Sequence, residues 1–577
     1  MHPSPHRFNA SRRHALVVIL AVIAFILALA RATNRESTAD EVLFSACLTL
    51  ALATALVFFT RRIGLGLLLA AGLVLALRTI SLVKQSYLGT LLYASDLLYF
   101  GNDNTLDVIA HYPQIWHPLA LRGALALGAL AVCIAWERPL WRRIRTRWRL
   151  LLQLAGGFAC LIALWALAAP TGPFRHIHAR GEWEEITSTS PLTSFVLSLY
   201  RMHVDIPAPD PQLADRDDWG EPATPESPPA NPPERRLPDI VVVLEESTFD
   251  PAILADCTIR ECRSAMFDAD AYTLAHGPLQ VHTIGGGTWT SEFTFFSGMP
   301  STLFGRAGLY APFNLAPHLR YALPRVLKEH GYRNIAVYPM GANFLDAKRA
   351  YEFYGFDAFH DAAEFNLGWE SSDLAIEQEL EKIYRRERAS SDQPLFLMLL
   401  TMRQHGPHSD AYANLPKPYD HPLFPQLDDK LNLCLSNYLA RLSGSLEALT
   451  RLQTMLFASG RPAILAHFGD HQPSFDGYIA RLRGADAVNG LGDPRMLTYY
   501  MIRSNDPAAP KHGYPVLDLA FLAGLILDTA EIPKGPFFTA NAALRERCKG
   551  RYLDCPDKGL LDSYLSFVFA HLHSLSR

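Results

Sequence analysis

The sequence lacks an excess of charge of either sign: its 577 residues include 53 Lys and Arg and 57 Asp and Glu, a formal net charge of −4. Nucleic-acid binding usually requires a marked basic excess or a basic patch, so we expect no nucleic-acid partner. No two of the eight cysteines form a Cys-x-x-Cys pair, which argues against a zinc ribbon. Apolar residues, by contrast, make up 49% of the chain. That share is high for a simple soluble enzyme, and the length predicts more than one domain.

The apolar residues gather in five runs near the N-terminus: Ala15–Ala30, Val42–Thr60, Ile63–Val83, Leu119–Trp136 and Leu150–Ala169. Each run approaches the roughly 20 residues needed to cross a bilayer as a helix. A single run could be a buried core helix, and the first could be a signal peptide. Five successive runs instead predict a bundle of five transmembrane helices.

Arginine is concentrated in alternate connections between these runs. The residues are Arg7, Arg12 and Arg13, then Arg61 and Arg62, then Arg138, Arg142, Arg143, Arg145, Arg147 and Arg149. Short loops rich in Lys and Arg remain on the cytoplasmic side of the membrane. Because the number of spans is odd, everything after Ala169 is predicted to lie outside the cytoplasm.

We therefore expect three parts: a transmembrane domain over residues 1–170, a connecting segment over 171–238 and a catalytic domain over 239–577. In the connecting segment, Ser190–Met202 is either a helix lying at the membrane surface or a plain connector, and the residues favour neither. Pro207–Pro238 is dense in proline and acid, including Pro228, Pro229, Pro232 and Pro233. Such a composition predicts a semi-rigid spacer.

The cysteines agree with an extracytoplasmic C-terminal part. Cys47, Cys133 and Cys160 lie in predicted spans, where a thiol behaves as a small apolar group. Outside the spans, the pairs Cys257 with Cys262 and Cys548 with Cys555 are close enough to close small disulfide loops in an oxidising compartment. Cys434 is left over and is expected to be buried.

Short apolar runs after residue 238 predict the strands of a sheet. The runs are Ile240–Leu244, Asn334–Tyr338, Leu395–Thr401, Ala463–Phe468 and Met496–Ile502. Helical stretches separate them, such as Leu323–His330, which Gly331 could terminate. Alternating strands and helices predict an α/β domain with a mostly parallel sheet covered on both faces. Its chemistry is expected beyond the carboxyl ends of the strands.

Two of these strands end in possible metal ligands. Glu245-Glu246-Ser247 follows the first strand, and Gly469-Asp470-His471 follows the Ala463–Phe468 strand. Carboxylate and imidazole ligands suit Zn²⁺ or Mn²⁺. Taken singly, an acid after a strand is more often a helix cap, and an Asp-His pair is more often part of a solvated loop.

A glycine run, Gly285-Gly286-Gly287, leads into Thr288-Trp289-Thr290-Ser291-Glu292-Phe293 and a predicted helix. Glycine permits close backbone approach, and a helix N-terminus attracts anions. The Thr288 hydroxyl could bind the metal, lose its proton and attack phosphorus. Local chemistry leaves Thr290 and Ser291 as rival nucleophiles, and the plainer alternative is a turn with Thr288 as a helix cap.

A fourth fragment, Thr401–His408, follows the Leu395 strand and supplies histidines to the same predicted edge. His405 could give a proton to a leaving oxygen. For one histidine taken alone, an ordinary loop hydrogen bond is the commoner role.

The ordered combination of these fragments resembles a family. Glu246-Ser247, Thr288-x-x-Ser291-Glu292-Phe293, His405-Gly406-Pro407 and Gly469-Asp470-His471 are similar to the motifs of sulfatase-like transferases of bacterial envelopes, in the alkaline phosphatase superfamily. With the five-helix anchor, the chain resembles lipoteichoic acid synthases and phosphoglycerol transferases most, with phosphoethanolamine transferases as relatives. The resemblance covers the anchor and about Asp239–Ile502, and it says nothing of the segment after Asn505.

The resemblance implies roles for particular residues. Glu246, Thr288, Asp470 and His471 would hold one divalent ion, Mn²⁺ or Zn²⁺, with Thr288 as nucleophile and His405 facing the substrate. One feature departs from the family. Lipoteichoic acid synthases carry a Trp-x-Arg pair that contacts glycerol phosphate, whereas this chain has Leu345-Asp346-Ala347, followed by Lys348 and Arg349.

The predicted function is metal-dependent transfer of a phosphoglycerol or phosphoethanolamine headgroup through a phosphothreonine. The donor would be phosphatidylglycerol or phosphatidylethanolamine, and the acceptor an envelope glycan or lipid. The predicted location is the bacterial inner membrane, with the catalytic domain in the periplasm. The alternatives are a sulfatase or phosphodiesterase-type hydrolase and an inactive membrane-anchored binding protein. A true sulfatase would need a Cys-x-Pro-x-Arg signature, which none of the eight cysteines provides. The oligomeric state is not predicted.

Overall fold

The structure is a computed structural model that describes residues 5–99, 110, 112–142, 144–178, 189–200, 207, 210–214, 216–220 and 236–576. The chain divides into two compact units, each described here by itself. One comprises Met1–Ser86 with Thr90–His203, and the other Tyr87–Gly89 with Val204–Arg577.

The first unit is helical. Its long helices are α1 (Pro5–Thr33), α2 (Ala39–Thr60), α3 (Ile63–Leu88), α6 (Pro113–Trp136) and α7 (Thr146–Ala168). Its short helices are α4 (Asp96–Tyr99), α8 (Arg175–His178) and α10 (Pro191–Ser198). All five long helices are long and apolar enough to cross a membrane, which confirms the predicted number of spans.

Polar contacts tie the helices of this unit together at their ends. Glu137, just after α6, accepts hydrogen bonds from the N–H groups of Gly64 (2.8 Å) and Leu65 (2.9 Å) at the start of α3. Near α10, Glu36 accepts from the N–H of Leu192 (3.1 Å) and from Oγ1 of Thr193 (2.5 Å). These carboxylates satisfy N–H groups that have no partner within their own helices.

The region predicted as an interfacial helix or a connector contains α10, whose Leu192, Thr193 and Leu197 are buried against the rest of the unit. Met202 lies outside the described residues. Most of the predicted spacer, including Pro228, Pro229, Pro232 and Pro233, lies outside them as well, as does Arg143.

The second unit is built on an eight-stranded sheet in the order β4-β3-β5-β1-β6-β7-β2-β8. The strands are β1 (Asp239–Glu245), β2 (Thr273–Gln280), β3 (Arg333–Val337), β4 (Ala358–His360), β5 (Leu395–Leu400), β6 (Ala463–Gly469), β7 (Leu497–Ser504) and β8 (Leu517–Asp518). The five neighbours from β4 to β6 are parallel, whereas β7 is antiparallel to both β6 and β2. The predicted mostly parallel sheet is thus confirmed, with one antiparallel strand inside it.

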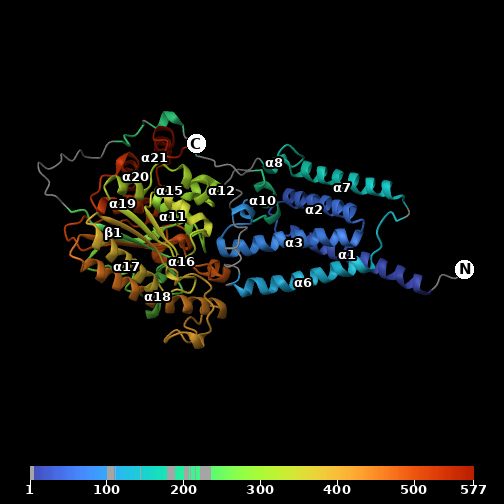
Figure 1. Cartoon of the computed structure of the whole chain (residues 1–577), viewed down its shortest axis with the longest axis horizontal. Helices are drawn as coiled ribbons and strands as arrows, with labels where there is room; N and C mark the ends of the chain where they lie inside the picture. The colour runs from blue at the N-terminus through green and yellow to red at the C-terminus, as the bar shows by residue number, and fades with distance from the viewer. Residues whose placement is uncertain are drawn as a thin grey trace. The chain divides into compact units, whose positions relative to one another are not determined.

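Helices cover both faces of this sheet, as predicted (Figure 1). The α-helices are α11 (Thr288–Ser297), α12 (Gly305–Gly308), α13 (Ala311–Asn314), α14 (Leu323–Glu329), α15 (Ala347–Tyr354), α16 (Ala362–Phe365), α17 (Asp373–Ser390), α18 (Asp429–Phe457), α19 (Leu522–Thr529), α20 (Gly535–Arg547) and α21 (Lys558–Ser566). On β1, Ile240 and Val242 face the core that contains α11, α15 and α19, while Val241 and Val243 face the core of α17 and α18. This alternation is why β1 is a continuous apolar run.

The structure also answers the smaller predictions for this unit. Disulfides join Cys257 to Cys262 and Cys548 to Cys555, and Cys434 is buried. Gly331, just past α14, has a φ of +83° and ends the helix as predicted. The segment after Asn505 supplies β8, α19, α20 and α21, which complete one face of the sheet.

Candidate active site

The predicted site residues meet at the carboxyl ends of three neighbouring parallel strands. Glu246 follows β1, His405 lies beyond β5, and Asp470 and His471 follow β6. β6 pairs with β1 up to Glu245 opposite Gly469. A Cβ on Gly469 would lie 1.7 Å from the carbonyl oxygen of Thr248, so only glycine lets the two strand ends approach this closely.

Thr288 is the first residue of α11 and points at this edge. Gly287 occupies the helix N-cap with a φ of +89° and makes no side-chain cap, so Thr288 is not the cap of the plainer alternative. The Thr288 Oγ1 donates a hydrogen bond to Oε2 of Glu246 at 2.8 Å and lies 3.4 Å from Nε2 of His471. The hydroxyl therefore adjoins both a carboxylate and an imidazole from two different strand ends.

The rival hydroxyls are engaged elsewhere. Thr290 is buried and donates to the carbonyl of Gly287 at 2.7 Å. Ser291 is also buried and donates to the carbonyl of Asp470 at 2.7 Å. Thr288 is only half-buried, so among the three it has the hydroxyl open to a substrate.

Glu246, Asp470 and His471 form a buried cluster whose ligand atoms all lie within 4.8 Å of one another. Asp470 Oδ1 accepts from the N–H groups of Ser247 and His471, each at 2.8 Å. Its Oδ2 makes no hydrogen bond within the described residues and lies 3.2 Å from Nε2 of His471. His471 Nδ1 is 3.0 Å from the carbonyl of Gln472, and donation to that carbonyl leaves Nε2 free toward the cluster.

The electrostatics of the cluster suit a cation. Burial and the neighbouring Glu246 raise the pKa of Asp470 well above its usual range, while burial lowers the pKa of His471. Burial would also raise the pKa of Glu246, but His471, His405 and a hydrogen bond from Thr288 outweigh it and lower that pKa. Two carboxylates and an imidazole, with one carboxylate oxygen unpaired, form a donor set that a divalent ion would satisfy.

His405 lies beside this cluster, where its charge interacts with Glu246 and His471. Its Nδ1 is 2.8 Å from the carbonyl of Gly406, and the indole of Trp369 packs against its ring at a centroid distance of 4.2 Å. Arg441 donates to the carbonyl of His405 at 2.9 Å. Burial lowers the pKa of His405, so the ring is held neutral at pH 7 with Nε2 available for proton transfer.

Comparison with known proteins now identifies the family. The sequence profile described as Sulfatase matches residues 238–532, just over half of the chain. The chain belongs to the sulfatase family. The predicted resemblance is therefore confirmed at this level, and the match includes all five predicted site residues.

Two curated relatives and one solved structure are similar to this sulfatase-family protein. A Haemophilus influenzae protein described as uncharacterized is 32% identical over 58% of this chain and 61% of its own length, less than two thirds. A candidate cyclic beta-1,2-glucan modification protein of Rhizobium meliloti is 25% identical over 92% of this chain and 85% of its own. The Streptococcus pyogenes phosphoglycerol transferase GacH, with sn-glycerol-1-phosphate, has a TM-score of 0.46 and 17% identity, covering 59% of this chain and 91% of that one.

Three residues near the site of this sulfatase-family protein were not predicted from its sequence. Trp369 packs on His405, as described above. Asp373, at the start of α17, accepts from the N–H groups of Met402 (3.1 Å) and Arg403 (2.9 Å) and so holds the loop that carries His405. An acid in the first helical turn was the available signal, but it does not reveal which distant loop it binds.

Glu292 is the third, although it belongs to a motif quoted for the resemblance. It is buried and accepts a hydrogen bond from the hydroxyl of Tyr351 at 2.6 Å. Burial, opposed by the Tyr351 hydrogen bond and reinforced by Asp470 and Glu246, raises the pKa of Glu292 to about 8. This carboxyl is thus mostly protonated at pH 7.

In the stretch that departs from the lipoteichoic acid synthases, Leu345 and Ala347 are buried, whereas Lys348 and Arg349 are exposed. Leu345 and Asp346 have φ values of +50° and +57°, and the described contacts of Arg349 are with Asp346 and the ring of Phe353. The Arg349 side chain is 67% exposed. It makes no described contact with the five site residues.

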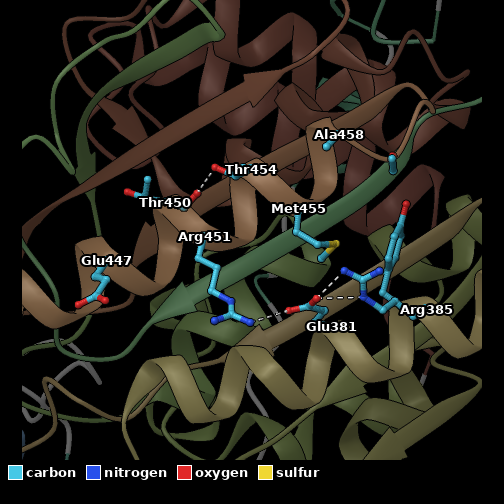
Figure 2. A pocket seen from close by; sticks show the side chains of 10 residues that line it. Glu381, Arg385, Glu447, Thr450, Arg451, Thr454, Met455 and Ala458 are labelled. Atoms are coloured by element: carbon cyan, nitrogen blue, oxygen red, sulfur yellow. Dashed lines mark hydrogen bonds and ion pairs between the residues drawn. The ribbon is translucent and has the colours of Figure 1, made fainter.

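A separate hollow of about 710 Å³ lies between α17 and α18. Figure 2 shows three of its charged side chains paired with one another: Glu381 bonds Arg385 at 2.7 Å and lies 3.6 Å from Arg451. None of the five predicted site residues lines it. Because three of its four charged side chains are paired with one another, its size alone does not make it a substrate site.

Proposed function

We propose that this sulfatase-family protein transfers a phosphoglycerol or phosphoethanolamine headgroup from a membrane phospholipid to an envelope glycan or lipid. The observation that carries the proposal is the Thr288 hydroxyl. It is half-exposed at a helix N-terminus and is hydrogen-bonded to Glu246 beside His471 and the unpaired oxygen of Asp470. A hydroxyl nucleophile supported by carboxylate and imidazole ligands suits attack on phosphorus.

Glu246, Asp470, His471 and Thr288 would together hold one divalent cation, Mn²⁺ or Zn²⁺. When bound, the cation supplies positive charge that favours loss of the Thr288 proton and offsets the charge on the phosphoryl oxygens. The chain's own contribution is to orient these ligands. Gln472 fixes the His471 ring, and the N–H groups of Ser247 and His471 fix the Asp470 carboxylate.

In the first step, Thr288 Oγ1 forms a bond to phosphorus, and the bond from phosphorus to the diacylglycerol oxygen breaks. The hydroxyl proton moves along the existing hydrogen bond to Oε2 of Glu246. The departing diacylglycerol oxygen takes a proton from Nε2 of His405, which enters this step as the imidazolium and leaves it neutral. The product is a phosphothreonine that carries the headgroup.

In the second step, an acceptor hydroxyl attacks the same phosphorus and gives its proton to Nε2 of His405. The bond from phosphorus to Oγ1 breaks, and Oγ1 regains a proton from Glu246. Because burial lowers the pKa of His405, its neutral form prevails at pH 7, as a base in this step requires.

The rest of the chain supports the choice of substrates. Five membrane-spanning helices would hold the catalytic unit near a lipid donor and raise its effective concentration. The Rhizobium meliloti relative is described as a candidate glucan modification protein, which agrees with a glycan acceptor. The arginine-rich connections support a catalytic unit in the periplasm and an anchor in the inner membrane.

Mass spectrometry of lipids and envelope glycans tests the reaction directly. Cells with the wild-type chain should contain headgroup-modified acceptor and extra diacylglycerol, whereas cells with the Thr288→Ala chain should contain neither. Free glycerol phosphate or phosphoethanolamine without a modified acceptor would indicate a phosphodiesterase. Identical lipids and glycans in both strains, from protein that still binds metal, would favour a binding protein.

A reporter fusion tests the proposed location. A periplasm-dependent alkaline phosphatase fused after Arg577 should be active, and a reporter that works only in the cytoplasm should be inactive there. The opposite pattern would refute the proposed orientation without bearing on the chemistry.

A further inference from the structure

The membrane-spanning unit contains an apolar cavity of about 310 Å³ between α2, α3, α7 and α10. That volume is at the lower end of ligand pockets in proteins. Leu48 and Leu52 of α2 and Leu161 and Leu164 of α7 are among the side chains that line it. On each helix the lining stripe spans eight residues, Ser45 to Leu52 and Leu161 to Ala168, or roughly 10 Å along the axis.

The polar side chains of the α2 wall are already satisfied. Ser45 shares a hydrogen bond of 3.3 Å with Thr193, and Thr49 donates to the carbonyl of Ser45 at 2.7 Å. A polar ligand would therefore find no free partner on this wall and would lose its own hydration. The wall formed by α10 is held in place by Glu36 through Leu192 and Thr193, so the cavity exists without a ligand.

The packing of α2 and α7 shows where the cavity lies along the membrane. The C-terminal end of α2 touches the middle of α7: a Cβ on Gly156 would lie 2.2 Å from the ring of Phe58, and one on Gly157 2.6 Å from that of Phe59. The cavity lies toward the N-terminal end of α2 and the C-terminal end of α7, which the proposed orientation places in the outer leaflet. Trp165 and Leu199, which are 64% and 53% exposed, line it, so it opens to the surrounding hydrocarbon.

We propose that this cavity binds one acyl chain of the donor phospholipid. An unfilled apolar cavity is destabilising, and the medium around this one is acyl chain aligned with the helix axes. The identification of the bound lipid as the donor rests on the proposed function. The binding of an acyl chain does not.

The experiment uses the full-length protein in bilayer nanodiscs with phosphatidylglycerol and phosphatidylethanolamine that carry a photoreactive group on one acyl chain. Labelling should concentrate on peptides containing Leu161–Ala168 and Pro191–Ser198 rather than on lipid-facing α6. Leu164→Trp and Leu52→Trp, on opposite walls, should each reduce that labelling by half or more. Their matched controls, Ile162→Trp and Leu50→Trp, replace exposed residues of the same helices that do not line the cavity and should label as wild type.

Uniform labelling of all five long helices, or undiminished labelling in both filled variants, would overturn the acyl site. The initial rate of headgroup transfer, measured on the same samples, tests the donor role. In the two variants that fill the cavity, the transfer rate should fall together with the labelling. In the two control variants, it should equal the wild-type rate. Lost labelling with an unchanged rate would overturn the donor assignment, and specific labelling by a wild-type chain that transfers no headgroup would count against the proposed function alone.

Discussion

Buried carboxylates occur in both units of the chain, but their surroundings differ. In the described part of the membrane-spanning unit, no buried carboxylate oxygen lacks a hydrogen-bond partner, as Glu36 and Glu137 illustrate. In the described part of the catalytic unit several have none, among them Oδ2 of Asp470, Oε1 of Glu245 and both oxygens of Glu377. Because an unpaired buried polar group is costly, the satisfied carboxylates are structural, and each unsatisfied one requires an explanation.

Two of these unsatisfied carboxyl groups, Glu377 and Asp470, also differ from each other. Burial and the neighbouring acids Glu245 and Asp373 raise the pKa of Glu377 well above its usual range, which favours its uncharged form. Burial and Glu246 raise the pKa of Asp470 in the same direction, but Asp470 adjoins the imidazole of His471 and belongs to a mixed donor set with His471 and Glu246. The comparison indicates that a carboxylate left open among mixed ligands serves chemistry, whereas one that caps a helix serves the fold.

The strongest test removes the nucleophile. Thr288→Ala should lower the rate of headgroup transfer by roughly 10³-fold or more, because no phosphothreonine can form, while Thr288→Ser should retain part of it. Thr290→Ser, which keeps the hydrogen bond to Gly287, should transfer nearly as wild type. Peptide sequencing after trapping with donor lipid should place the phosphoryl adduct on Thr288, and an adduct on Thr290 or Ser291 would refute the assignment.

The next largest effect is expected when a proposed metal ligand is substituted. This test distinguishes a buried acid that binds metal from one that only stabilises the fold. His471→Ala and Asp470→Asn should each lose the divalent ion and the activity together, since each removes one member of a three-residue set. Elemental analysis of the purified full-length protein measures the ion. His421→Ala, which changes an exposed histidine, is the control, and unchanged metal content in both site variants would show that the ion binds elsewhere.

Glu292 should make the stability of the catalytic unit depend on pH. Its pKa is raised from 4.5 to about 8, so its stabilising contribution is fully present below about pH 4.5 and is lost as the pH rises toward 8. In metal-free protein, Glu292→Gln should therefore gain stability relative to wild type between pH 5 and pH 8, by an amount on the order of a few kcal/mol. Thermal unfolding at both pH values measures it. The exposed Glu352→Gln should show no such trend.

The smallest effect is expected in the membrane-spanning unit. Glu137→Ala would leave the N–H groups of Gly64 and Leu65 without their acceptor, at a cost of about 1–2 kcal/mol. Local opening should then let a thiol reagent reach the buried Cys133 about 5- to 30-fold faster. Asp40→Asn, at an exposed ion pair, should change this labelling rate little. Lost transfer with unchanged labelling would contradict a purely structural role for Glu137.

Several strands could be predicted from the sequence, and others could not. β1, β3, β5, β6 and β7 lie within one or two residues of their predicted bounds because each is a run of buried apolar residues. β2 was missed because Gly277, Pro278 and the exposed His276 interrupt its apolar pattern. Its pairing with β7 and β8 comes from neighbours distant in sequence. β4 and β8, of three and two residues, are too short to show a period.

The sequence by itself determined the membrane spans and the main strands, because these depend on composition and local apolar runs. Short spacing made two disulfide pairs possible, and the five candidate site residues came from fragments at strand ends taken together with a family resemblance. Only the tertiary structure decided which hydroxyl is free. Thr288, Thr290 and Ser291 are equivalent in local chemistry, but α11 turns the last two toward backbone carbonyls and leaves Thr288 beside Glu246. The unpaired oxygen of Asp470, the packing of Trp369 on His405 and the apolar cavity between α2 and α7 likewise depend on residues far apart in sequence. Such contacts arise from strand order and helix packing, and no local pattern encodes them.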